Sequence, residues 1–367
     1  MFTHKIVTLD KKFWQGKKVL LTGHTGFKGS WLSLWLQSLG ANCVGFSLAP
    51  HTQPSFFEIA QLNTRMVSIF GDIRNLELLK KIFKRYQPEI VIHMAAQALV
   101  RYSYQEPLET YMINVMGSIN LFEAARLTNS VKVIANVTSD KCYENNDSKK
   151  IFTEEDKLGG GDPYSNSKAC SELVTQAYYQ SYFKAKNIGM VSMRAGNVIG
   201  GGDWAKDRIV PDIINACIKE ENLFLRYPSA LRPWQHVLEP LSAYLLLTQR
   251  LYEQPEYSGP WNFGPDEYDT KAVSWITNYI INYLRSPIKW FLNENESPYE
   301  SSHLKLDSSK AKANLGWMPC WSIEKCLDKA INWYQAYQEN EDMFEMSLSQ
   351  INEFMKDYRK IHERIKC

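Results

Sequence analysis

The segment KVLLTGHTGFKG, residues 18–29, joins a short apolar run directly to the start of a predicted helix. Its first four residues predict a strand, and residues 31–39 carry apolar side chains at helical spacing. Gly23, Gly26 and Gly29 lie in the turn between them. Glycine accepts positive φ at no steric cost, and its missing side chain lets backbone N–H groups approach a pyrophosphate. Any strand-to-helix turn can carry glycines, but this placement after the first strand predicts a dinucleotide-binding site, with candidate residues Gly23, Thr25, Gly26, Phe27, Lys28 and Gly29.

The alternation of strand and helix continues beyond this turn. Further strands are predicted at residues 42–48, 66–70, 90–94 and 131–137, and a helix is predicted at residues 111–127. Runs of this kind at this spacing are typical of βαβ units with a parallel sheet. The predicted fold is therefore α/β, a Rossmann-like doubly wound parallel sheet with a smaller, mostly C-terminal α/β substrate-binding domain.

The second half of the chain has a weaker pattern. It contains predicted helices but no linker and no internal repeat, so we expect it to fold as a cap that shares the main sheet. The predicted helices lie at residues 209–218, 240–251, 275–284 and 323–337. We expect a nucleotide-binding domain over residues 1–195 with a returning segment near 236–265, an interleaved substrate domain over 196–340, and an amphipathic helix over 341–367.

The last of these helices has one apolar stripe. Phe344, Leu348, Ile351, Met355 and Tyr358 recur at spacings of three and four residues, which places them on one helical face. Two interpretations stay open: the helix packs on its own subunit, or it contributes to a dimer contact.

Composition excludes several classes of protein. The chain has 367 residues and a formal net charge of +2, which does not favour a nucleic-acid or anionic membrane partner. No apolar run approaches the roughly 20 residues that a membrane-spanning helix needs. The seven cysteines are scattered without a Cys-x-x-Cys pair, so we expect a reduced, cytoplasmic protein without a metal site.

The identity of the dinucleotide is not settled by the second strand. An acidic residue there is typical of NAD binding and an arginine of NADP binding, but residues 45–48 read Gly-Phe-Ser-Leu. Asp72 and Ile73 follow the third strand and are candidates to contact the adenine. Alternatively, Asp72 only caps the helix that follows.

Tyr164 and Lys168 form a candidate catalytic pair. They lie four residues apart in a helix that opens with Asp162 and Pro163, so both side chains share one face. Tyrosine normally has a pKa of about 10, and a nearby ammonium favours its phenolate. Tyr164 is therefore a plausible base for a hydroxyl proton while hydride leaves the same carbon.

With the glycine turn, this pair resembles the extended short-chain dehydrogenase/reductase family over nearly the whole chain. The resemblance implies NAD as cofactor, a homodimer or homotetramer, and cofactor contacts from Ala95, Ala96 and Asn114. It rests on residues 22–29, 71–73, 93–96, 114–117, 164–168 and 194–198, and on two segments later in the chain, Lys305-Leu306-Asp307 and Leu315-Gly316-Trp317.

Ser139, Asp140 and Lys141 distinguish the reaction. They follow a predicted strand of the parallel sheet, where ligand crevices form. Epimerases of this family typically carry no acid–base pair here, whereas a 4,6-dehydratase must remove the C5 proton and protonate the departing C6 hydroxyl. Asp-Lys at this place resembles CDP-glucose 4,6-dehydratases, as do residues 23–32, 138–143, 201–204 and 232–237.

The resemblance implies a mechanism in which Tyr164, helped by Lys168 and Ser139, takes the C4 hydroxyl proton during oxidation. Asp140 then protonates the leaving C6 hydroxyl, and hydride returns to C6 to give a 4-keto-6-deoxy sugar. Lys141 acts as the C5 base only if it is neutral; otherwise its ammonium supports the enolate and another group is the base. Asp140 and Lys141 could instead form an exposed ion pair.

Candidate substrate contacts are spread along the chain. Guanidinium groups match phosphate oxygens in a bidentate way, and Arg232 is the arginine most favoured for the diphosphate. The amides are candidates for hydroxyl contacts and the tryptophans for stacking on the base or sugar. The full set is Gln97, Arg101, Arg194, Asn197, Trp204, Arg208, Arg232 and Trp234.

Other functions compete with this interpretation. A sugar-nucleotide 4-epimerase, or a dehydratase for another nucleotide, is separated by its product. A non-catalytic NAD(P)-binding regulator, or a structural oligomer with a vestigial site, has no need of Ser139, Tyr164 and Lys168. The resemblance implies a role in deoxysugar synthesis for a bacterial surface polysaccharide such as the O-antigen of lipopolysaccharide.

Overall fold

A parallel sheet forms the centre of the molecule. The computed structural model describes residues 9–146, 150–293 and 303–366, and within them seven strands pair in the order β12-β7-β5-β4-β1-β2-β3, all parallel. This confirms the predicted α/β fold with a doubly wound sheet. The strands are β1 (Lys18–Thr22), β2 (Asn42–Ser47), β3 (Val67–Phe70), β4 (Ile90–His93), β5 (Val133–Val137), β7 (Gly189–Ala195) and β12 (Gly259–Phe263).

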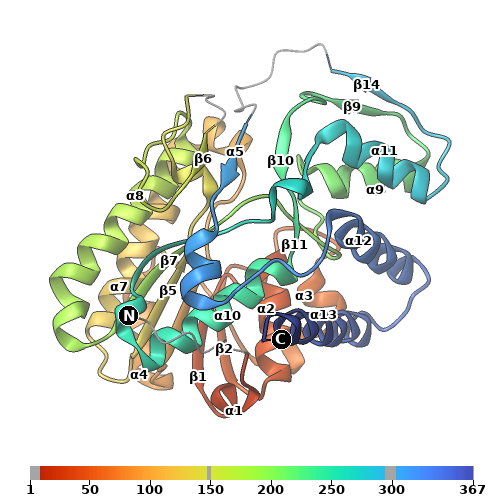
Figure 1. Cartoon of the computed structure of the whole chain (residues 1–367). Helices are drawn as coiled ribbons and strands as arrows, with labels where there is room; N and C mark the ends of the chain where they lie inside the picture. Colours follow the sequence, from red (N-terminus) through yellow and green to blue (C-terminus); the bar gives the residue numbers. More distant parts are fainter. Residues whose placement is uncertain (1–8, 147–149, 294–302, 367) are drawn as a thin grey trace.

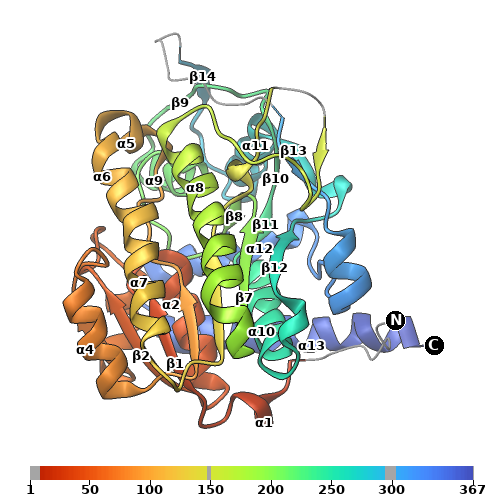
Figure 2. The ribbon, with the colours of Figure 1, turned by 90° about the vertical axis from the view of Figure 1, so that its left-hand side faces the viewer.

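Helices cover both faces of this sheet. Figure 2 looks onto α4 (Leu76–Tyr86), α7 (Gly117–Arg126) and α8 (Pro163–Tyr178), which lie side by side across one face. On the other face, α2 (Phe27–Ser38) and α10 (Leu238–Glu253) contact the strands. Because successive strand residues point to opposite faces, β1 supplies Leu20 to the core under α4 and α7, and its other apolar residues to the larger core under α2 and α10.

The helix predicted at residues 111–127 is not continuous. It consists of α6 (Pro107–Tyr111), a π-helical turn at Met112–Met116, and α7. The π turn holds Asn114, whose side chain is buried. Such turns insert one extra residue and often occur at functional sites, and apolar periodicity alone does not reveal them.

The second half adds helices and short strand pairs. Strand β12 returns to the edge of the main sheet, and α9 (Ile209–Lys219), α11 (Val273–Tyr283) and α12 (Ile323–Gln338) follow the predicted helices closely. In Figure 1, α9 and α11 lie at the upper right, away from α1 and α4. The short strands pair as β6 (Ile151–Phe152) with β15 (Lys305–Leu306), β8 (Val198–Ile199) with β11 (Gln235–His236), β9 (Leu223–Leu225) with β14 (Trp290–Leu292), and β10 (Leu231–Pro233) with β13 (Thr270–Ala272).

The final helix, α13 (Met343–Lys366), packs on its own chain against α2 and α12. Phe354 is fully buried and its ring lies 5.9 Å from that of Trp35. None of the described helices has the length and apolarity needed to cross a membrane. The remaining α-helices are short: α1 (Lys11–Trp14), α3 (Phe56–Ile59) and α5 (Val100–Gln105).

Candidate active site

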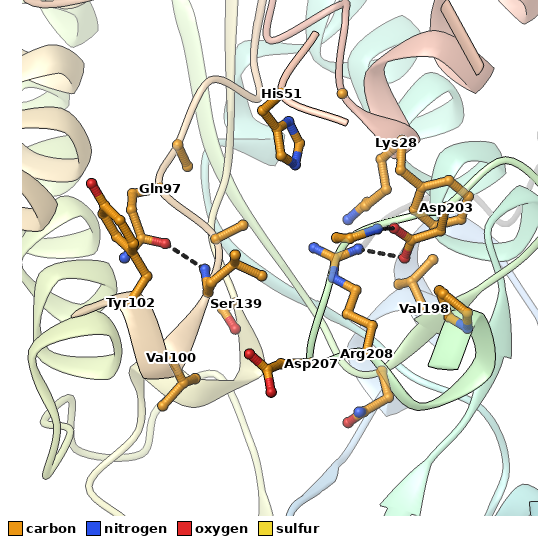
Figure 3. A pocket seen from close by; sticks show the side chains of 18 of the residues that line it. Lys28, His51, Gln97, Val100, Tyr102, Ser139, Val198, Asp203, Asp207 and Arg208 are labelled. Carbon is orange, nitrogen blue, oxygen red and sulfur yellow. Dashed lines mark hydrogen bonds and ion pairs between the residues drawn. The ribbon is translucent and has the colours of Figure 1, made fainter. Parts of the chain in front are cut away.

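A cavity of about 940 Å³ runs from the glycine turn to α9 and β9. Its wall contains the loops that follow β1, β4 and β5, the start of α8, and residues of the second half. Figure 3 shows Gln97 and Tyr102 on one side of it and Lys28, Asp203 and Arg208 on the other. Every residue predicted for catalysis, cofactor binding or substrate binding lines this cavity except Asn114 and Arg194.

The three glycines of the turn have different environments. Gly23 has φ +76°, and a Cβ there would lie 2.7 Å from the Ala95 nitrogen. A Cβ on Gly29 would lie 2.0 Å from the Gly23 carbonyl oxygen. Gly26, in contrast, faces the cavity, and a Cβ there would meet only that same oxygen, at an ordinary 3.5 Å. The fold itself therefore requires the first and third glycines, and the second leaves room for a ligand.

Helix α2 begins at Phe27, inside the predicted glycine turn and four residues before Trp31, where the predicted helical spacing starts. Its N-cap is Gly26, and no side chain caps it. The first backbone N–H groups of the helix therefore remain available, and they carry the partial positive charge of a helix N-terminus. This arrangement fits a diphosphate.

The neighbouring part of the wall fits an adenosine. Thr25 Oγ1 lies 2.9 Å from Ser47 Oγ and donates to the Leu48 carbonyl oxygen at 2.9 Å, which ties the turn to the end of β2. Asp72 lines the cavity and pairs with Arg74 at 2.6 Å, and this hydrogen bond lowers the pKa of the Asp72 carboxyl. Helix α4 is capped by Asn75, so Asp72 does not have the capping role considered from the sequence.

Asp140 is a buried acid with one free oxygen. It follows β5, where the Ser139 hydroxyl accepts from the Lys141 nitrogen at 3.2 Å and donates to Asp140 Oδ1 at 3.1 Å. Asp140 is only 4% exposed, and its Oδ2 has no hydrogen-bond partner among the described residues. Burial raises the pKa of Asp140, against the opposing effects of Lys141 and Ser139. The protonated form is therefore favoured more than in a free aspartate.

Tyr164 and Lys168 lie on the same face of α8, as predicted. The helix begins after Asp162, whose side chain accepts from the Ser165 nitrogen at 2.9 Å. Burial raises the pKa of Tyr164 to about 12, while a hydrogen bond with Ser139 lowers it. Burial lowers the pKa of Lys168 to about 8, so this amine is still mostly charged at neutral pH. Its Nζ lies 6.0 Å from the centre of the Tyr164 ring.

The two predicted residues outside the cavity wall have structural partners. Asn114 accepts from the Gln97 nitrogen at 2.9 Å and donates to the Gln97 carbonyl oxygen at 3.0 Å, so it holds the loop after β4. Arg194 is buried and pairs with Glu172 at 2.8 Å, and it also donates to Tyr143 at 2.7 Å. Arg194 thus lies outside the cavity wall, and its guanidinium forms a buried ion pair in place of the predicted diphosphate contact.

The other predicted arginines do line the cavity. Arg208 pairs with Asp203 at 2.8 Å, and Arg101 pairs with Asp207 at 2.8 Å. Arg232 is buried, 6% exposed, at the end of the wall formed by β10. These groups give the middle of the cavity an excess of guanidinium groups suited to an anion.

Several amide and aromatic candidates are partly used by the fold. Gln97 donates from its side chain to Thr110 Oγ1 at 2.9 Å. Trp234 donates to the Lys271 carbonyl oxygen at 2.9 Å, and the Trp204 ring packs 5.5 Å from that of Trp333. Asn197 is half-buried in the wall.

The cavity also contains residues that the sequence did not single out. They are charged or titratable groups that the fold brings to the cavity from separate parts of the chain, so no single local pattern marked them. Lys28, predicted only as part of the glycine turn, donates to the Tyr244 hydroxyl at 3.1 Å, and burial lowers its pKa to about 7. The others are His51, Asp203, Asp207, Asp212 and Arg226. Among the described residues, no group of three or more histidine, cysteine or acidic side chains is placed to hold a metal ion.

Comparisons with known proteins agree with this geometry. Residues 20–258 match the sequence model of the family described as GDP-mannose 4,6 dehydratase. A CDP-glucose 4,6-dehydratase from Salmonella typhimurium is 48% identical over 353 residues, which cover 95% of this chain and 98% of that protein.

Two solved structures share the fold. An epimerase from Methanothermobacter thermautotrophicus has a TM-score of 0.77 at 22% identity, covering 90% of this chain and 96% of that one. A dTDP-glucose 4,6-dehydratase from Bacillus anthracis, solved in complex with NAD, has a TM-score of 0.73 at 21% identity, covering 90% and 100%.

Proposed function

Because this chain belongs to the GDP-mannose 4,6-dehydratase family, we propose that it converts CDP-D-glucose to CDP-4-keto-6-deoxy-D-glucose and water. The observation that carries the reaction type is Asp140. It is a buried acid with a free oxygen, beside Ser139 and in the same cavity as Tyr164. A dehydration needs such an acid, and an epimerisation at C4 does not.

The cavity fits NAD as the cofactor. The uncapped start of α2 and the open position at Gly26 fit the diphosphate. Asp72 and Ile73 line the adenosine side, and we assign them to the adenine. Bound NAD supplies the hydride acceptor for C4 and the hydride that later reduces C6.

Tyr164 acts at the C4 hydroxyl. Its phenolate takes the proton of that hydroxyl, and three groups of this chain favour the phenolate. A hydrogen bond with Ser139 and the charge of Arg208 both lower its pKa, and the mostly protonated amine of Lys168 lies 6.0 Å from the centre of its ring. A nearby cation and a hydrogen-bond donor both stabilise the ionised form.

Asp140 and Lys141 act at C5 and C6. Asp140 donates its proton to the departing C6 hydroxyl, which leaves as water. Lys141 is half-buried next to it in the cavity wall, and we assign it to the C5 proton. It serves either as the base or as the cation beside the enolate. Arginine at this position keeps a cation and cannot act as a base, so activity of Lys141→Arg would indicate the second role.

Arginines from both halves of the chain are assigned to the nucleotide. Arg208, Arg101 and Arg232 line the cavity, and we propose that they bind the diphosphate. Arg208 and Arg101 also pair with Asp203 and Asp207, so the diphosphate shares their guanidinium groups with these acids. Asn197 and Gln97 line the same cavity as the catalytic residues, and we assign them to sugar hydroxyls.

We further propose a homodimer formed through the outer surface of α6, α7 and α8. Four apolar side chains are exposed there: Leu108 at 75%, Met112 at 40%, Met116 at 42% and Leu173 at 54%. Clustered exposed apolar residues are typical of protein–protein contacts. The family resemblance supports a cytoplasmic enzyme whose product supplies deoxysugars for surface polysaccharide.

The test is a product assay. The purified protein would be incubated with NAD and, separately, with CDP-glucose, dTDP-glucose, UDP-glucose and a GDP-linked sugar. The account predicts a 4-keto-6-deoxy product from CDP-glucose, seen as loss of one water by mass and as alkali-induced absorbance. Product from another nucleotide sugar alone would remove the cytidine assignment. Inversion at C4 without loss of water would instead indicate an epimerase.

A further inference from the structure

The end of the cavity away from the glycine turn is formed by the start of α9 and by β9. Leu225 of β9 and Arg226, which follows that strand, line it together with Asp212 in the first turn of α9. Arg208 is the N-cap of α9 and pairs with Asp203, and its carbonyl oxygen accepts from the Asp212 nitrogen at 3.0 Å. Asp212 therefore lies one helical turn along α9 from Arg208.

Asp212 is a half-buried carboxylate without a donor. Among the described residues, none donates a hydrogen bond to its side chain, although Arg226 is close enough to favour its ionised form. Burial, with Asp207 and Asp203 adding to it, raises the pKa of Asp212 to about 6. At neutral pH the group is mostly ionised. In the open cavity water can reach the carboxylate oxygens, but a bound base excludes that water and must then supply a donor of its own.

The arginines next to Asp212 are already paired with other acids. Arg226 bonds to Asp207 at 2.9 Å, and Arg101 bonds to the same oxygen at 2.8 Å. Arg208 bonds to Asp203 at 2.8 Å. The Asp212 carboxylate is thus the acceptor in this part of the cavity that has no donor among the described residues.

The proposed function places a nucleotide here. With the hexose at Tyr164 and the diphosphate at Arg208, the base extends toward α9 and β9. Cytosine carries an exocyclic amino group, a hydrogen-bond donor, where uracil and thymine carry a carbonyl oxygen. We propose that Asp212 determines the nucleotide specificity of the enzyme by accepting a hydrogen bond from the exocyclic amino group of cytosine. The inference rests on the proposed function and deepens it.

The same carboxylate rejects the competing pyrimidines. The O4 atom of uracil or thymine would face an oxygen of like partial charge and would leave Asp212 without a donor. A site built for a donor discriminates strongly against an analogue that lacks it, because the buried polar group is then left unpaired. Attraction of cytosine and rejection of uracil therefore come from a single group.

The test compares nucleotide binding by the NAD-loaded enzyme with Asp212→Leu and Asp212→Asn. Calorimetric Kd values for CDP and UDP report binding without catalysis. Loss of a hydrogen bond to a charged group predicts that Asp212→Leu weakens CDP binding on the order of 10- to 100-fold. UDP binding is expected to stay unchanged or to tighten. In turnover, the KM for CDP-glucose rises while kcat stays near the wild-type value.

The Glu253→Gln variant is the matched control, because it removes an exposed carboxylate at the end of α10 outside the cavity. An acid in the first turn of a helix also stabilises that helix. A purely structural role of Asp212 predicts equal losses for CDP and UDP, at either variant, and that result would overturn the inference. Asp212→Asn keeps the shape of the side chain and answers the question if the leucine variant does not fold.

Failure of the proposed function has a different signature. In that case the wild-type enzyme forms no dehydrated product from CDP-glucose. A wild-type enzyme that dehydrates CDP-glucose, with an Asp212→Leu variant that keeps the full preference for CDP over UDP, would instead refute only the role of Asp212.

Discussion

The Asp140→Asn substitution removes one transferable proton and little else. Asp140 is 4% exposed, and its Oδ1 accepts from Ser139 at 3.1 Å, a contact that the amide oxygen of asparagine can keep. Its Oδ2 has no partner to lose. The variant should therefore fold, and the change should act on proton donation to the C6 hydroxyl. General acid catalysis contributes about 10²- to 10⁴-fold, so we expect kcat to fall by about that factor, or about 3–5 kcal/mol.

Two signals separate this loss from a loss of binding. Rapid mixing with CDP-glucose should still produce the absorbance of reduced nicotinamide in Asp140→Asn, because Tyr164 is intact, while the dehydrated product accumulates slowly. Tyr164→Phe should lose both signals. The reasoning is refuted if Asp140→Asn turns over within about tenfold of the wild type, since general acids contribute more than that.

The pH dependence gives a further check on the same group. Burial raises the pKa of Asp140, so its protonated form persists to higher pH than in a free aspartate. The acid must be protonated to act, and kcat should therefore decrease as pH rises through the pKa of Asp140 in the folded enzyme. Asp140→Asn should not show that decrease.

Three further predictions concern the rest of the structure. Arg194→Met should destabilise the protein by about 3–5 kcal/mol in denaturant unfolding, because it leaves a buried carboxylate unpaired, yet refolded enzyme should keep its KM for substrate; a raised KM at full stability would contradict this. Gly26→Ala should fold normally and lose NAD affinity in a titration, whereas Gly29→Ala should unfold, since its Cβ would lie 2.0 Å from a backbone oxygen. Equal stability of the two variants would contradict the different roles assigned to the two glycines. Burial raises the pKa of Glu239 from 4.5 to about 8, so its ionisation lowers the stability of the folded protein between those two pH values. In thermal unfolding, the stability of Glu239→Gln relative to the wild type should therefore increase from pH 5 to pH 8. The same pH dependence of Tm in both proteins would contradict this.

The central sheet could be predicted because its strands are buried on both faces. Residues 90–93 and 133–137 are buried throughout, and apart from His93 and Asn136 they are apolar, which is typical of parallel strands. The fold class was confirmed. The strand pairs of the second half were not predicted, because strands such as β8 and β11 have two residues each and show no period.

The buried face of the C-terminal helix differs from the apolar stripe that its sequence predicted. Of the predicted apolar positions, Ile351 and Tyr358 are buried, but Phe354 is buried as well and was not included. Two polar residues belong to the buried face: Ser347 accepts from the Trp333 ring N–H at 2.8 Å, and Gln350 donates to the Lys329 carbonyl oxygen at 2.9 Å. Hydrogen bonds of this kind leave no trace in apolar spacing, and the face is therefore rotated from the predicted one.

Some residues of the candidate site could be predicted from local sequence patterns, and others could not. The glycine turn and the Tyr164–Lys168 pair are local patterns, and the sequence was sufficient to place them at one cavity. Arg194 looked like a phosphate ligand because its partner Glu172 lies on another element of the fold. Asp212 could not be recognised as a site residue from the sequence, since its proposed role depends on its position near β9 and Arg226 and on the absence of a donor among the described residues.

The central claim is that this enzyme removes water across C5 and C6 of CDP-glucose. The most direct measurement is mass spectrometry and proton NMR of the product formed with NAD in deuterium oxide. The account predicts a sugar nucleotide that has lost one water, with a methyl group at C6 and solvent deuterium at C5. A product with the mass of the substrate, or a dehydrated product without solvent deuterium at C5, would contradict it.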